Sequence, residues 1–519
     1  MQIIICMKTI KLSLSTLRTY CVFYEVFYFF KFAFSRKTPL AIMLLSLVSL
    51  LSQGQISIIF PVPRAVIQRD NANQASLNIA GRIKNQVDRI EARLVPRTEQ
   101  ARLDTMMATS WQIVQQNPAN FFSGTISVKG GWYNLQMRAI KGGVTIIDTL
   151  IVQRVGIGEV FVYVGHSNAQ GGAYGQTGPD AIDDRVSCIS VGKEPSCNGR
   201  VPFPPATISD SLWCNYLQTG DAQFLPVLTF SKVAKSAGIA PFCGLPWFWS
   251  IVGDSLSRKL NVPIMFYGTA FGGTKSEYWF KASQGILFDH SFINSAIKMP
   301  YINLKNVLQL YLPLTGIRGV LCLHGVNDRN DSQADIQTWM QGYIAQSRVD
   351  SKIPNLAWMI ATDSYLLDHG LYPQPFPLKF EVRNAQAFVQ SLPNNFQGPD
   401  LDVITDNNAG NPTSERPDGL HFGNQGLVSA ANLWVNAINK PSFLKGSTPK
   451  LAQTFKVNSL QSGGWQKTES WDCNCFPQKY HSMTVKPGHI VQVDAIKTRP
   501  LNLILQGIIN LNNKGVLGF

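Results

Sequence analysis

The chain has 519 residues, of which 45% are hydrophobic and 15% are charged, a composition that excludes a mainly disordered protein and leaves room for several domains. Its formal net charge is +14, but part of this charge lies at the amino terminus, where residues 1–54 contain six Lys and Arg residues and one Glu. The other basic residues form no dense stripe and accompany no nucleic-acid-binding motif, so we expect no nucleic-acid partner.

Residues 1–54 have the features of a targeting segment. Arg36 and Lys37 precede an apolar stretch over residues 39–51, and Ser52-Gln-Gly54 supplies small residues for cleavage. This stretch is shorter than the about 20 apolar residues that a membrane-spanning helix needs. We therefore expect an exported protein (secreted, periplasmic or at the cell surface) without a stable membrane span in its mature form. A cleaved signal peptide and a retained membrane-targeting segment both fit the sequence.

Residues 55–155 favour short β-strands. The segment 132–138 alternates apolar and polar residues, and the segments 75–80 and 148–152 are rich in β-forming residues. Polar turns such as Lys129-Gly-Gly131 separate them. Several short strands in such a segment predict a β-sandwich-like domain.

From residue 156 to residue 440 the pattern becomes that of an α/β domain. Four apolar runs cover residues 160–164, 263–267, 319–323 and 356–360. Longer segments of helical periodicity separate these runs. This alternation predicts a parallel sheet with helices on both faces, and ligands of such sheets bind beyond the carboxyl ends of the strands. Residues 441–519 return to β-like, turn-rich sequence, which predicts a small β-rich module.

The first apolar run ends at Gly165-His166-Ser167-Asn168, where a buried strand would deliver a serine to the edge of the sheet. A hydrolytic serine needs a base and a carboxylate that orients the base. Among seven histidines, His421 is the best placed, because it follows Asp418 in a polar Pro/Gly loop before an apolar helix. An Asp-x-x-His loop can place the carboxylate against one imidazole nitrogen and leave the other nitrogen for Ser167. The alternative for His421 is a surface or helix-capping role.

Two further motifs offer donors for an oxyanion hole. Gly272 follows the run 263–267 in Phe-Gly-Gly-Thr, and Asn327 follows the run 319–323 in Gly-Val-Asn-Asp. A glycine N–H and an asparagine amide are both suitable donors. Each motif is also compatible with ordinary turn chemistry.

A second serine, Ser255, lies in Gly253-Asp-Ser-Leu256, which matches a known hydrolase signature. This motif precedes the run 263–267 by only a few residues. A strand that bears a nucleophile would need a connection of about a dozen residues or more before the next parallel strand begins. Residues 251–260 fit better as one helix that leads into that strand. We therefore expect Ser255 to have no catalytic role.

In this order, Gly165-x-Ser167-Asn168, Gly272, Gly325-x-Asn327 and Asp418-x-x-His421 resemble the motifs of the SGNH hydrolase superfamily. The chain looks most like its carbohydrate O-acetylesterases of the sialate O-acetylesterase type. Two stretches are especially close to that group: Val155-Gly-Ile-Gly158-Glu-Val160 running into Gly-x-Ser-Asn, and Gly272-Gly-Thr-x-x-Glu277-x-Trp279. The resemblance covers residues 130–435.

The resemblance implies a flavodoxin-like three-layer α/β domain with Ser167 as nucleophile, His421 as base and Asp418 as the group that orients the base. It also implies an oxyanion hole made by the N–H groups of Ser167 and Gly272 and by the side chain of Asn327. It implies no metal and no cofactor.

Two positions depart from the sialate O-acetylesterase group. His166 stands where that group usually has glutamine, and Val326-Asn327 replaces its usual Glu-Ser. Both departures leave the expected catalytic groups in place. They make another acetylated sugar as admissible a substrate as an acetylated sialic acid.

The sequence thus predicts an exported serine esterase that removes O-acetyl groups from carbohydrates. Two alternatives stay open: a non-catalytic glycan-binding or adhesion protein, and a lipid or thioester hydrolase that uses the same residues. Four aromatic residues near the expected strand ends would either stack on sugar rings or pack in the core, namely Tyr163, Trp247, Trp249 and Trp279.

Export permits disulfides. Residues 55–519 contain seven cysteines, an odd number that leaves at least one of them unpaired within the chain. Cys188 and Cys197 flank a Gly/Pro-containing loop and are candidates for pairing. Cys473-Asn-Cys475 offers half of a zinc site, but no matching Cys/His pair stands at ligand spacing.

Overall fold

The computed structural model describes residues 54–97, 107–172, 178–191, 211–226, 228–367, 377–405, 411, 413–494 and 500–511. The predicted targeting segment, except for Gly54, lies outside these residues, and so does Cys197. Within the described residues, no helix combines the length and the hydropathy that crossing a membrane requires.

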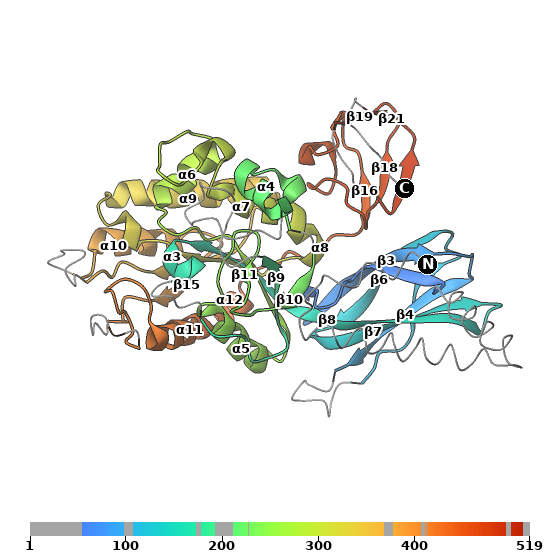
Figure 1. The fold of residues 1–519 in the computed structure, drawn as a ribbon, viewed down its shortest axis with the longest axis horizontal. Helices are drawn as coiled ribbons and strands as arrows, with labels where there is room; N and C mark the ends of the chain where they lie inside the picture. The colour runs from blue at the N-terminus through green and yellow to red at the C-terminus, as the bar shows by residue number, and fades with distance from the viewer. Residues whose placement is uncertain are drawn as a thin grey trace, which may run out of the picture. The chain divides into compact units, whose positions relative to one another are not determined.

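Antiparallel strands form most of the chain before the α/β sheet, with one short strand, β2 (Val66–Gln68), parallel to β8 (Figure 1). One group has the order β1-β3-β6; in the other, β4 pairs with β5 and β7, and β7 pairs with the first half of β8. Their bounds are β1 Ile56–Phe60, β3 Gln74–Ile83, β4 Arg89–Pro96, β5 Gln112–Gln116, β6 Phe121–Lys129, β7 Gly131–Lys141 and β8 Thr145–Gly165. Apolar residues of both groups, among them Leu77, Phe122, Leu94 and Leu135, belong to one hydrophobic core.

Strand β8 continues from these antiparallel strands into the α/β sheet (Figure 1). Its first half pairs antiparallel with β7, and its last residues pair parallel with β12 (Ile264–Gly268) and β13 (Gly319–Leu323). Before residue 155 most of its side chains reach the solvent at least in part, whereas every residue from Val155 to Gly165 is buried. The change marks the passage from a sheet with one solvated face to a sheet covered on both faces. The predicted domain boundary at residues 155–156 therefore falls inside a continuous strand.

The centre of the α/β sheet is parallel and has the strand order β12-β8-β13-β14-β15. Here β14 is Trp358–Thr362 and β15 is Asn395–Asp400, and β9 (Val186–Val191) lies parallel beside β12. When the five central strands alone are numbered along the chain, leaving out β9, their order is 2-1-3-4-5, which is the order of doubly wound flavodoxin-like sheets. The expected parallel α/β sheet is present, and its carboxyl edge collects the ends of β8, β12, β13 and β14.

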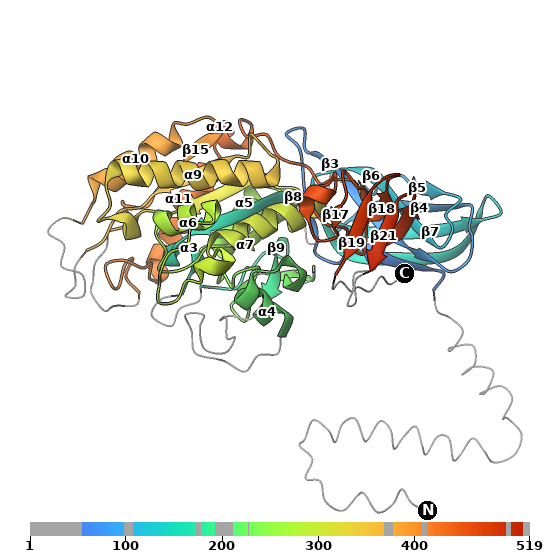
Figure 2. The ribbon, with the colours of Figure 1, turned by 90° about the horizontal axis from the view of Figure 1, so that it is seen from above.

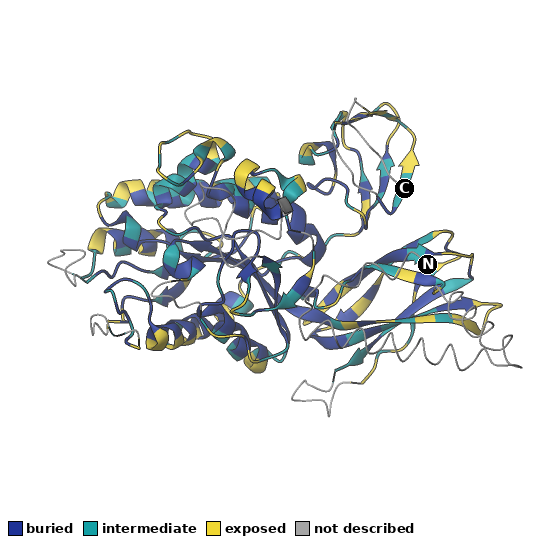
Figure 3. Ribbon diagram, in the orientation of Figure 1, coloured by how far each residue is buried: buried dark blue, intermediate teal, exposed yellow. Residues whose placement is uncertain are grey.

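Alternate residues of β8 face two separate hydrophobic cores. Val160, Val162 and Val164 belong to one core, and Phe161 and Tyr163 belong to the other. The first core includes residues of α6 (Ser276–Gln284), α7 (Tyr301–Asn306), α9 (Gln333–Ser351) and α10 (Phe380–Gln390). The second includes residues of α5 (Trp249–Leu260) and α11 (Asn424–Ile438). Figure 1 shows the two groups of helices on opposite sides of the sheet, Figure 2 gives the view from above onto the first group, and Figure 3 shows that the strands between them are buried.

The last strands of the chain form a module of parallel pairs with the orders β16-β18-β20 and β17-β19-β21. Its inner side chains include Val457, Met483, Val491, Trp465 and Trp471, all of them buried. The strands are β16 Lys456–Asn458, β17 Gly463–Gly464, β18 Ser482–Val485, β19 Ile490–Val493, β20 Asn502–Leu505 and β21 Ile508–Leu511. The tail is thus rich in β-structure, as its sequence predicts.

Candidate active site

Ser167 lies directly beyond the carboxyl end of β8, at the start of the short helix α3 (Ser167–Gln170). The preceding Gly165 has a φ of 143°, and a Cβ atom added there would lie 2.1 Å from the carbonyl oxygen of Leu323 on the neighbouring strand. Only glycine fits this close approach of two strands. The chain can therefore turn sharply after β8 and present Ser167 at the edge of the sheet.

His421 lies in the loop before α11, and its imidazole joins Ser167 to Asp418. Its Nε2 is 2.8 Å from Ser167 Oγ, and its Nδ1 is 2.6 Å from Asp418 Oδ2. Asp418 Oδ1 also accepts hydrogen bonds from the backbone N–H groups of Leu420 and His421. With Nδ1 donating to the carboxylate, Nε2 is the acceptor for the Ser167 hydroxyl.

The charge state of Asp418 suits this arrangement. Burial acts to raise the pKa of this carboxyl group, but the hydrogen bond and the charge of His421, with the two backbone N–H donors, outweigh it and lower the pKa below the ordinary value of 3.8. The carboxylate is therefore ionised at neutral pH and can stabilise an imidazolium.

Asn168 connects the serine turn to the histidine loop. Its Nδ2 donates to the carbonyl oxygen of Leu420 at 3.1 Å, and its Oδ1 accepts from the N–H of Phe422 at 3.4 Å. These are the two residues on either side of His421, so one buried amide holds both flanks of the base. The sequence motif contains Asn168 but does not reveal this role, because its partners lie far away along the chain.

Two of the predicted oxyanion donors, Gly272 and Asn327, already have acceptors within the protein. The N–H of Gly272 donates to Gln170 Oε1 at 2.6 Å, and Asn327 Nδ2 donates to the carbonyl oxygen of Thr274 at 2.9 Å. A Cβ added at Gly272 would lie 3.6 Å from both Cα and Cβ of Ser167, which places this turn against the serine. Gln170, which the sequence did not single out, thus occupies the donor on Gly272. The second N–H of the Asn327 amide is still available in principle for an oxyanion.

His166, which stands where sialate O-acetylesterases usually have glutamine, is fully buried. Its Nε2 is 2.7 Å from Oδ2 of Asp363, which is equally buried, and its Nδ1 accepts from the N–H of Asn168 at 3.3 Å. The ring therefore faces the protein interior and has no exposed surface for a substrate. Asp363 directly follows β14, the fourth apolar run of the sequence, and its place at a strand end was the signal that could have drawn attention to it.

Ser255 lies in α5, as its spacing from the next strand predicts. The neighbouring Asp254 accepts hydrogen bonds from the backbone N–H groups of Ile182 and Asp183. This aspartate therefore has a structural task, and the Gly-Asp-Ser-Leu motif belongs to a helix rather than to the carboxyl edge of the sheet.

The aromatic residues considered for sugar stacking are core residues. Tyr163, Trp247, Trp249 and Trp279 have no exposed surface. Tyr163 and Trp249 stack on each other with ring centroids 4.6 Å apart. They were expected near strand ends, but Trp249 and Trp279 lie in helices α5 and α6, and all four side chains belong to the two cores.

The cysteines differ from expectation in two ways. Cys188 is a free, buried cysteine, so the suggested pairing with Cys197 is wrong. Cys473 and Cys475 form a disulfide with each other, which removes the half of a zinc site considered there. Within the described residues no group of three or more His, Cys, Asp or Glu side chains could hold a metal ion.

No protein-family model matches the chain, and no curated protein matches it. Among solved structures it is similar to a carbohydrate acetylesterase from Xanthomonas citri, with 15% identity, coverage of 75% of this chain and 76% of that chain, and a TM-score of 0.42. It is also similar to a lipase/acylhydrolase from Enterococcus faecalis (15% identity, 41% of this chain, 93% of that chain, TM-score 0.25). A peptidoglycan O-acetylesterase matches with 10% identity over 76% of each chain and a TM-score of 0.26. The identities are 15% or less and the TM-scores lie below 0.5, so these likenesses say nothing about the activity of this chain.

Proposed function

We propose that the protein is a serine esterase that forms an acyl-enzyme on Ser167. The observation that carries this proposal is the continuous line of contacts from Ser167 Oγ through His421 to Asp418, with heavy-atom distances of 2.8 Å and 2.6 Å. Such distances allow proton transfer from a hydroxyl to an imidazole. The line stands at the carboxyl edge of a parallel sheet, where α/β proteins bind their ligands.

In this mechanism His421 Nε2 takes the proton of Ser167 as Oγ attacks the ester carbonyl. Asp418 holds the imidazole in the required tautomer and stabilises the imidazolium. The tetrahedral intermediate collapses when His421 gives its proton to the leaving alcohol oxygen, and the acyl group stays on Ser167. Water, deprotonated by His421, then attacks the acyl-enzyme and releases the acid.

Gly272, Asn327 and the N–H of Ser167 are the groups we assign to the oxyanion. Stabilisation of the oxyanion by such donors typically supplies 100-fold to 1,000-fold in rate for each donor. Because Gln170 accepts the single N–H of Gly272, the acyl oxygen has to replace or share this acceptor, whereas the amide of Asn327 has a second N–H beside the one that Thr274 accepts.

For the substrate we propose an O-acetyl group on a carbohydrate, met outside the cytoplasm. The support is the resemblance of the motifs at Ser167, Gly272 and Asp418 to sialate O-acetylesterases, together with the export features of residues 1–54. His166 does not weigh against an acetylated sialic acid, since its buried ring lies away from any substrate. It does not single out that sugar either.

The experiment is hydrolysis of an aryl acetate by the wild type, by Ser167→Ala and by Ser255→Ala. We expect the first variant to lose its activity and the second to retain that of the wild type. Equal activity of wild type and Ser167→Ala would overturn the proposal. Release of acetate from acetylated sugars, compared with hydrolysis of long-chain acyl esters and thioesters, then separates a carbohydrate esterase from a lipid or thioester hydrolase. Glycan binding without any turnover would indicate an adhesion protein.

A further inference from the structure

A second pair of a histidine and an aspartate lies directly behind the serine turn. His166 and Asp363 have no exposed surface, and His166 Nε2 is 2.7 Å from Asp363 Oδ2. Since Nδ1 of the same ring accepts from the N–H of Asn168, Nε2 has to carry the hydrogen that points at Asp363. His166 also caps α3, the helix that begins with Ser167. The pair therefore fixes the backbone on both sides of Ser167.

The charge of Asp363 is maintained although the group is buried. Burial acts to raise its pKa, but the hydrogen bond from His166, the charge of Arg416 and a backbone donor outweigh this effect and lower the pKa. Arg416 Nη2 lies 3.8 Å from Asp363 Oδ1, and Arg416 is itself fully buried. An ionised carboxylate and a guanidinium thus lie together in the interior, between the serine turn and the histidine loop.

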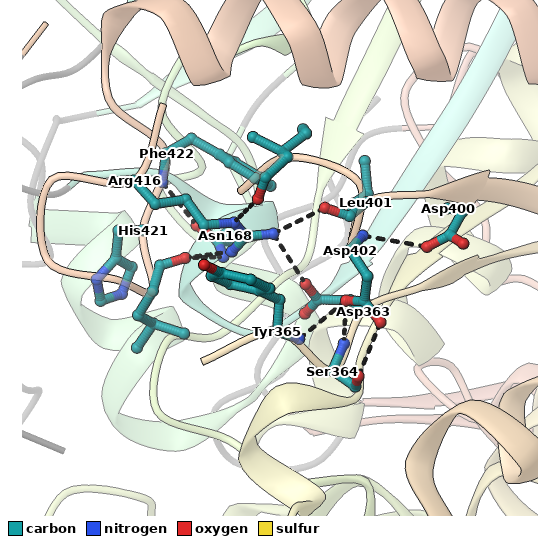
Figure 4. Close-up of polar contacts among 12 residues, drawn as sticks. Asn168, Asp363, Ser364, Tyr365, Asp400, Leu401, Asp402, Arg416, His421 and Phe422 are labelled. Carbon is teal, nitrogen blue, oxygen red and sulfur yellow. Dashed lines mark hydrogen bonds and ion pairs between the residues drawn. The ribbon is translucent and has the colours of Figure 1, made fainter. Parts of the chain in front are cut away.

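Arg416 extends the contacts to the loop that carries His421 (Figure 4). Its Nη1 donates to the carbonyl oxygen of Leu420 at 2.5 Å, and its guanidinium carbon lies 4.6 Å from the centre of the Phe422 ring. Its Nε and Nη2 donate to the carbonyl oxygens of Ile404 and Leu401. One planar, rigid side chain therefore touches both residues that flank His421, the same two that Asn168 contacts.

We propose that His166, Asp363 and Arg416 form a positioning network that keeps Ser167 and His421 at reacting distance. This inference rests on the proposed function, and none of the three residues touches the substrate. Replacing a buried ion pair by apolar residues is often neutral or stabilising, so stability alone is a weak reason for such a pair. Nδ1 of His166 accepts from the N–H next to Ser167, and Nη1 of Arg416 donates to the carbonyl oxygen next to His421, so the network reaches the backbone beside both reacting groups.

The decisive variants are at His166. His166→Leu removes both hydrogen bonds, whereas His166→Gln can still donate to Asp363 and accept from Asn168. We expect His166→Leu to lower kcat for an aryl acetate by roughly 100-fold, the scale of a displacement of about 1 Å, with little change in KM. The rate at which a fluorophosphonate labels Ser167 should fall in parallel. His166→Gln should restore most of both rates.

A buried ion pair away from the site provides the matched control. Glu159 and Arg318 are also buried, with Arg318 Nε 2.8 Å from Glu159 Oε2, but Glu159 lies at the beginning of the parallel part of β8 and Ser167 lies beyond its end. Glu159→Gln should lower the Tm and leave kcat of the folded enzyme unchanged. His166→Leu behaving like Glu159→Gln, with lower Tm and normal kcat and labelling rate, would overturn the network.

Failure of the network and failure of the proposed function are distinguishable in this set. One outcome supports the proposed function and contradicts the network. In it the wild type is active, Ser167→Ala is inactive, and His166→Leu has the kcat and labelling rate of the wild type. If His166→Leu does not fold, Asp363→Asn takes its place, since it keeps the volume and removes the charge. The same loss of kcat and labelling rate is expected there, and wild-type rates in folded Asp363→Asn would overturn the inference.

Discussion

Nδ2 of Asn168 donates a hydrogen bond to the carbonyl oxygen of Leu420, so the residue after the proposed nucleophile holds the residue before the proposed base. The same carbonyl oxygen accepts from Arg416. Two elements far apart in the sequence are thereby tied at one backbone atom. We expect the geometry of the Ser167–His421 contact to depend on these two hydrogen bonds.

Substitution of Asn168 should therefore impair catalysis. In Asn168→Ala, Leu420 keeps the donor from Arg416, but the N–H of Phe422 loses its acceptor on Asn168. We expect kcat to fall roughly 10-fold to 100-fold and the free energy of unfolding to fall by about 1–3 kcal/mol. Steady-state kinetics and urea unfolding measure the two effects. A variant with wild-type kcat would contradict the role of Asn168 in holding the loop.

Gln170 should control access to the oxyanion donor on Gly272. In Gln170→Glu a carboxylate would accept from this N–H more strongly and would repel the developing oxyanion, so we expect kcat/KM to fall by roughly 100-fold. Gln170→Met has similar length and leaves the N–H open, so its kcat/KM should not fall below that of the wild type. Hydrolysis of an aryl acetate at neutral pH measures both. An equal loss in the two variants would mean that Gln170 supports the Gly272 turn instead of competing with the substrate.

Asp418 should stabilise the fold in a pH-dependent way. Its pKa in the folded protein lies below the ordinary value of 3.8, so its contribution is fully present above that pH and is lost as the pH falls through the lowered pKa. The difference in free energy of unfolding between wild type and Asp418→Asn should therefore be constant near neutral pH and shrink only in strong acid. Unfolding series at several pH values test this, and a difference that already disappears between pH 5 and pH 7 would speak against it.

Asp328 should have the opposite effect. It accepts hydrogen bonds from N–H and Oγ of Ser276, but burial, the largest influence, raises its pKa to about 7. Because the folded protein binds this proton more tightly than the unfolded chain, wild-type stability should decrease as the pH rises from about 4 to about 7. Asp328→Asn should remove this slope. Unfolding measured at pH 5 and pH 8 compares the two proteins, and the same slope in both would exclude Asp328 as its source.

Local patterns in the sequence were enough to predict the serine at the end of a buried strand, the Asp-x-x-His loop and the helix that contains Ser255. Each depends on periodicity or spacing over a short stretch. Strand β8 and helix α5 lie where the apolar periodicity and the length of the segments predict them. The order of the motifs also indicated which strand ends would meet, because parallel strands of such a sheet place their carboxyl ends at one edge.

The tertiary structure alone decided which side chains share a hydrogen bond or lose all contact with water. The contact between Ser167 and His421 joins residues separated by 254 positions, and that between His166 and Asp363 joins residues separated by 197. No local pattern contains such a partner, so the contacts of Asp363 with His166 and of Gln170 with Gly272 could not be predicted, nor could the burial of the four aromatic residues. Hydrogen bonding and burial depend on the positions of whole strands and loops relative to each other, and these positions are set only when the two cores close around the sheet.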